Sequence, residues 1–181
     1  KNNPERPNQA ESPEQKRRKR DIQNLTWLLK TLHLPTLDQH ALDSPHVMQD
    51  RVLHFWEGFN SVINNSLFHL YDNNLATLLR DYHTAFRETV RHGEHYHSNV
   101  DGSAYIFSRA TSLTSAEENE KVSAAIRAGA DKMVELISRI LHIVRQDYLE
   151  VSIDDTNRAA WLEYVEFKKA EARALEDLGD A

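Results

Sequence analysis

The 181-residue chain contains no cysteine. That absence excludes disulfides, iron–sulfur clusters, thiolate zinc sites and thiol nucleophiles. Long apolar runs are also missing: no stretch approaches the roughly 18 apolar residues of a membrane span, and none near the first residue resembles an export signal. The sequence has no Gly-rich phosphate-binding loop and no GxSxG pattern. We therefore expect a cytoplasmic protein, or one at the cytoplasmic face of a membrane.

Charge is distributed unevenly along the chain. The first 20 residues hold seven Lys or Arg and three Glu, whereas the whole chain has a formal net charge of −6. The body is therefore acidic, which makes it a poor general binder of nucleic acid. Three prolines and few apolar side chains near the start predict a flexible basic arm over residues 1–19, followed by one domain over 20–181.

The basic run from Lys16 to Arg20 has several interpretations. It is suited to phosphates, to anionic lipid headgroups or to a nuclear import receptor. Because the first residue is Lys1 rather than Met, we expect further sequence upstream. Five adjacent cations would suit the cytoplasmic side of a membrane segment located there. A solvated linker is the simpler alternative.

Helical periodicity dominates the rest of the sequence. Ser115 and Glu118 form a capping-box pattern, and apolar residues then recur at steps of three and four through Val144, so a helix is predicted over 115–149. Such a helix would be on the order of 50 Å long, and other helices must pack along it. Similar patterns predict helices over 45–71, 73–92 and 153–178, and a short amphipathic helix over 20–33.

The predicted fold class is therefore all-α: an elongated antiparallel bundle of four long helices plus an N-terminal amphipathic helix. Residues 93–114 show no periodicity and are predicted to form a long loop, with a turn at Asn99, Asp101 and Gly102. Loops of that length without structure of their own are often functional.

Ionisable side chains concentrate where the predicted helix 73–92 ends. Glu88 and His92 are four residues apart and share a helical face, and His95 lies just beyond Gly93. Imidazole and carboxylate groups bind zinc, nickel and related ions. A divalent metal held by Glu88, His92 and His95 is therefore one hypothesis, and a solvated helix end is the alternative.

Arginine and histidine recur here at a spacing that resembles the motif of the HEPN ribonucleases. Two frames match, Arg87 and Glu88 with His92, and Arg91 and His92 with His97. The resemblance implies a dimer acting on RNA, in which histidine moves protons while a ribose 2′-OH attacks the phosphate and arginine stabilises the developing charge. The catalytic candidates would then be Arg87, Arg91, His92 and His97.

The leading interpretation is nevertheless a non-enzymatic interaction or regulatory module with a protein partner, tethered to a membrane through an upstream segment or the basic arm. A homo-oligomer is expected, with a dimer favoured, because an elongated acidic bundle can complete its apolar burial against its own copy. The alternative is a HEPN-like ribonuclease or metal-dependent hydrolase centred on residues 87–97.

Overall fold

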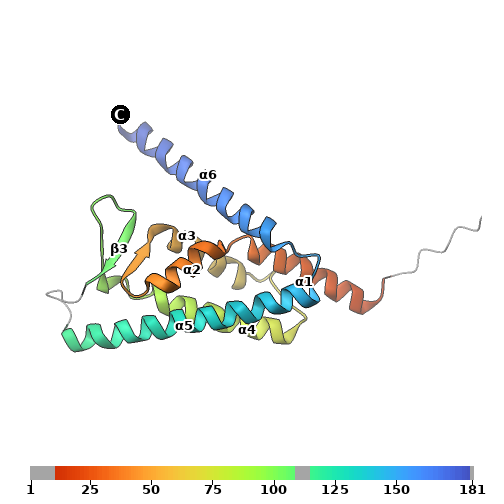
Figure 1. Cartoon of the computed structure of the whole chain (residues 1–181). Helices are drawn as coiled ribbons and strands as arrows, with labels where there is room; N and C mark the ends of the chain where they lie inside the picture. Colours follow the sequence, from red (N-terminus) through yellow and green to blue (C-terminus); the bar gives the residue numbers. More distant parts are fainter. Residues whose placement is uncertain (1–10, 109–114, 180–181) are drawn as a thin grey trace, which may run out of the picture.

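The computed structural model describes residues 11–108 and 115–179. These residues are mostly helical (Figure 1). The α-helices are α1 (Pro13–Leu29), α2 (Leu34–Asp43), α3 (Asp50–Ile63), α4 (Asn73–Val90), α5 (Ala116–Asp147) and α6 (Ile153–Gly179). A short 3-10 helix, η1 (Gly93–His95), and three strands, β1 (Val47–Gln49), β2 (Tyr96–Ser98) and β3 (Ala104–Phe107), complete the chain.

The body is built on α5 and the helix that packs most closely against it, α4 (Figure 1). Ser115 caps α5 as predicted, because its hydroxyl accepts a hydrogen bond from the Glu118 N–H at 3.1 Å. The predicted apolar stripe of α5 is largely confirmed as buried. Its fully covered members are Ile126, Gly129, Met133, Leu136, Ile137, Ile140 and Val144.

Gly129 is the point of closest approach between these two helices. A Cβ at this position would lie 3.1 Å from the Ala85 carbonyl oxygen and 3.1 Å from the Glu88 Cβ, both on α4. The absence of a side chain therefore allows the α4 backbone to pack directly on α5. Larger apolar residues fill the interface on the C-terminal side of this contact.

The other helices complete the core around this pair. Phe59 of α3 packs against Tyr82 and Phe86 of α4, with ring centroids of Phe59 and Tyr82 5.7 Å apart. Helix α1 contributes Leu25 and two further buried leucines. Helix α6 contacts the body as far as Lys168 and then extends away from it (Figure 1). The prediction of an all-α four-helix bundle is therefore only partly confirmed.

A small antiparallel sheet corrects the prediction of a structureless loop over 93–114. Strand β3 lies between β1 and β2, with Val47 opposite Ile106 and His97 opposite Ile106 on the other side. The predicted turn at Asn99, Asp101 and Gly102 is confirmed, and Gly102 supplies the positive φ of 72° that it needs. Residues 109–114 of the predicted loop lie outside the described residues.

The predicted helix over 45–71 is wrong at both ends. Ser44 does not open a helix but ends α2, since its N–H and its hydroxyl both donate to the His40 carbonyl. At the other end, the Asn65 side chain accepts a hydrogen bond from the Leu67 N–H, an Asx turn that competes with helix continuation. Residues 64–72 therefore form a linker between α3 and α4.

The boundary of the N-terminal arm also needs correction. Helix α1 begins at Pro13, so that residues 13–19, predicted as flexible, are helical. Ser12 and Gln15 form a reciprocal capping box, and Lys, Arg, Glu and Gln are all good helix formers, so the helix forms without burying apolar surface there. Residues 1–10 lie outside the described part of the chain. No helix among the described residues is long and apolar enough to cross a membrane.

The close approach at Gly129 yields a stability prediction. Gly129→Leu should lower the free energy of unfolding by about 1–3 kcal/mol, because the added side chain overpacks the contact with α4. Gly93→Leu is the control, since a Cβ there meets nothing within 4 Å. Urea unfolding followed by circular dichroism measures both. Equal stability of the two variants would show that α4 and α5 are not so closely packed.

Candidate functional site

The side chains at the end of α4 form a local ion-pair cluster. The Glu88 carboxylate lies 3.0 Å from His92 Nε2 through one oxygen and 3.1 Å from Arg91 Nε through the other. The Glu88–His92 spacing of four residues thus brings the two groups together on one helical face, as predicted. Both oxygens of Glu88 are engaged by neighbours on the same helix end.

His95 points away from this cluster into the protein. It is 2% exposed, and its Nδ1 lies 2.7 Å from the Asn119 side-chain oxygen on α5. The ring also stacks on Phe107 of β3, nearly parallel at 9°. His95 therefore joins η1, the sheet and the first turn of α5.

The remaining candidates lie at the surface. Arg87 is exposed on α4, and His97 is exposed on β2. The rings of His92 and His95 are 6.2 Å apart at their centroids and steeply inclined. Within residues 11–108 and 115–179, no group of three or more His, Asp or Glu side chains is arranged to hold a metal ion.

His40 is a buried histidine that the sequence did not single out. It lies on α2, is 2% exposed, and its Nε2 is 2.9 Å from the Thr89 hydroxyl of α4. Its other nitrogen, Nδ1, is buried with no hydrogen-bond partner among the described residues. Burial lowers the pKa of His40 to about 4, and nearby Asp43 offsets this shift only in part. His40 is thus held neutral near pH 7.

The second half of α6 is the least covered part of the described chain. Residues 169–177 are all exposed, and Leu175 keeps 66% of its surface accessible. Before that point α6 is anchored: Trp161 packs on His33, Tyr164 packs on Phe55, and Lys168 lies 3.4 Å from an Asp50 oxygen. The sequence predicted this helix but gave no sign that half of it projects from the body.

The two histidines beyond α4 provide a matched test of the sheet region. His95→Ala should lower the free energy of unfolding by about 2 kcal/mol, because it removes a buried hydrogen bond and a ring contact. His97→Ala, two residues further on and exposed, should change it by less than about 0.5 kcal/mol. Thermal melts compare the pair. Similar melting temperatures would show that His95 does not hold this region together.

The buried His40 should make stability depend on pH. Between about pH 6.5 and pH 4 the unfolded chain binds a proton at this site and the folded chain does not. The free energy of unfolding should therefore fall as the pH drops through this window, by roughly 3 kcal/mol. Urea unfolding of the parent and of His40→Gln at several pH values isolates the effect. An unchanged slope in the variant would rule out His40 as its source.

Comparison of the chain with family models, with curated proteins and with solved structures finds no match in any of the three. The assignment of Arg87, Arg91, His92 and His97 as catalytic residues therefore stays a prediction. So does a metal site at Glu88, His92 and His95, although His95 and His92 already have protein partners.

Proposed function

We propose that this protein is a non-enzymatic interaction module that pairs with a second copy of itself through the projecting half of α6. The observation that carries the proposal is a helix face that packs on the body at its start and continues past it with Ala172 and the exposed Leu175. Trp161, Tyr164, Lys168, Ala172 and Leu175 follow one another at steps of three and four and so share one side of the helix. The first three pack on the body; the last two are exposed.

The projecting segment gains stability from local interactions. Lys168 and Lys169 form ion pairs of 2.6 and 2.7 Å with Glu171 and Glu166, and alanines supply helix propensity. An isolated helix of about ten residues is still marginal in water. A partner that covers Leu175 would therefore both bury apolar surface and order the segment.

Charge along this segment favours a second copy running in the opposite direction. Its near end carries Lys168 and Lys169, which pair with Glu171 and Glu166, and its far end carries Glu176 and Asp177 beyond Arg173. Antiparallel pairing sets the basic end of one copy against the acidic end of the other, whereas parallel pairing opposes like charges. A two-fold axis through this contact gives a closed dimer.

Leu175 tests this pairing directly. The parent should be a dimer by native mass spectrometry and light scattering, and Leu175→Glu should be a monomer, because the change places a charge in the paired face. Ala170→Glu is the matched control, since Ala170 is exposed on the opposite side of α6 and its variant should stay dimeric. A monomeric parent, or a dimer that survives Leu175→Glu, would overturn the proposal.

Native mass spectra of protein purified without a histidine tag or chelator also test the alternative function, a metal-dependent enzyme, because they show any bound metal. Stoichiometric metal that disappears in His92→Ala would favour a metal-dependent enzyme over an interaction module. Metal bound equally by the parent and His92→Ala would instead exclude the predicted site.

A further inference from the structure

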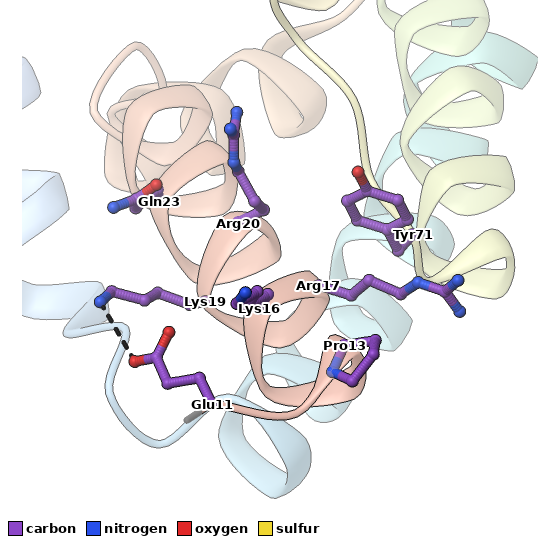
Figure 2. A pocket seen from close by; sticks show the side chains of 8 residues that line it. All are labelled: Glu11, Pro13, Lys16, Arg17, Lys19, Arg20, Gln23 and Tyr71. Carbon is purple, nitrogen blue, oxygen red and sulfur yellow. Dashed lines mark ion pairs between the residues drawn. The ribbon is translucent and has the colours of Figure 1, made fainter. Parts of the chain in front are cut away.

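A shallow hollow of about 520 Å³ lies on the outward side of α1, near the beginning of the helix (Figure 2). Its volume is within the range of small-molecule sites. Four cations surround it, Lys16, Arg17, Lys19 and Arg20. Tyr71, from the linker between α3 and α4, forms one wall, and Arg17 lies over its ring, 5.8 Å from the centroid.

The positive charge of the hollow is only partly compensated by the protein. Lys19 lies 3.5 Å from a Glu11 oxygen. In the described part of the chain, neither Lys16 nor Arg20 has an ion-pair or hydrogen-bond partner. All four cations also lie in the first half of α1, where the helix dipole favours negative groups. Helix stability therefore does not explain their position, and a bound anion would.

Gln23 and Trp27 extend the surface that Lys16 and Arg20 form on α1. Lys16, Arg20, Gln23 and Trp27 recur at steps of four, three and four, which aligns them along about 16 Å of one helix face. Trp27, at the end of this line, is 37% exposed.

The linker over residues 64–72 runs beside this face. Its backbone is held there by Asp21, which accepts the Tyr71 N–H at 2.7 Å, and by Asn24, which donates to the His69 carbonyl at 2.7 Å. As a result Tyr71, 47% exposed, lies next to the cations, and Phe68 packs on the Trp27 ring with centroids 6.4 Å apart. Leu67, 79% exposed, directly precedes Phe68 in this linker. We refer to the outward side of α1 with Leu67 and Tyr71 as the α1 face.

We propose that the α1 face docks on an anionic phospholipid bilayer, with the hollow receiving the phosphate of a headgroup. Lys and Arg are attracted to anionic lipid, while Trp and Tyr favour the interface between headgroups and acyl chains. An exposed Leu67 would insert among acyl chains, whereas it has no flat ring to stack on a nucleic-acid base.

This docking needs no membrane-spanning segment and is independent of pairing through α6. It can therefore be measured on the full chain carrying Leu175→Glu as well as on the parent, so that the two proposals fail separately. Two copies in a dimer would add avidity on one membrane, but each α1 face is expected to bind by itself.

Vesicle co-sedimentation tests the proposal. The parent should bind vesicles of phosphatidylcholine mixed with phosphatidylserine, and should not bind vesicles of phosphatidylcholine alone. Lys16→Gln with Arg20→Gln should weaken binding roughly 25-fold, about fivefold for each cation. The matched control is Lys121→Gln with Arg127→Gln, the same change of charge near the start of α5 and away from the α1 face, which should bind like the parent.

Trp27 supplies a second readout. Trp27→Ser should weaken binding to vesicles while leaving the salt dependence of that binding in place, because it removes an interfacial side chain and no charge.

Competition with soluble glycerophosphoserine distinguishes a lipid headgroup in a bilayer from a free phosphate. If it displaces the protein from vesicles at low concentration, the hollow binds a free headgroup and no bilayer is needed. Three outcomes would overturn the proposal. The protein binds both vesicle types equally, the control pair of substitutions weakens binding as much as the α1 pair does, or the protein binds single-stranded RNA and no vesicles.

Discussion

The close packing of α4 on α5 is the constraint on which the rest of the structure depends. Because Gly129 has no side chain, the α4 backbone comes within van der Waals distance of α5. Phe59 of α3 packs on the rings of Tyr82 and Phe86, which α4 carries into the same core. Thr89 is held facing α2, where its hydroxyl contacts His40. The closely packed α4–α5 pair thus carries the side chains on which α3 and α2 pack.

A second constraint is that the backbone N–H groups of the linker between α3 and α4 need hydrogen-bond acceptors. Toward the end of the linker over residues 64–72, the Tyr71 and Asp72 N–H groups have no helical carbonyl partner, and buried N–H groups must be paired. The buried carboxylate of Asp21 accepts two of them, from Tyr71 and Asp72. The same hydrogen bonds fix Tyr71 beside Arg17. The composition of the α1 face is therefore a consequence of how the linker satisfies its hydrogen bonds.

The features that the sequence predicted correctly depend on interactions between residues that are close in the chain, and the features that it missed depend on residues that are far apart. The apolar stripe of α5 and its Ser115 cap depend on residues within about one helical turn of each other, and both were predicted correctly. Strand β1 is stabilised by β3, whose residues lie more than 50 positions away, and no local pattern contains that pairing. Spacing placed His92 beside Glu88, but it could not show that His95 turns inward to Asn119, because spacing does not fix side-chain direction beyond a helix end.

The cations of helix α1 fall into two groups: Arg18 contacts the body of the protein, and Lys16 and Arg20 do not. Arg18 faces inward along the body, pairs with Glu150 at 2.7 Å and lies over the Tyr148 ring, so it joins α1 to the end of α5. Lys16 and Arg20 face outward and make no such contact among the described residues. The fold accounts for one of these cations but not for the other two. Like charges on adjacent turns repel one another, so Lys16 and Arg20 do not add to the stability of α1, whereas Arg18 does.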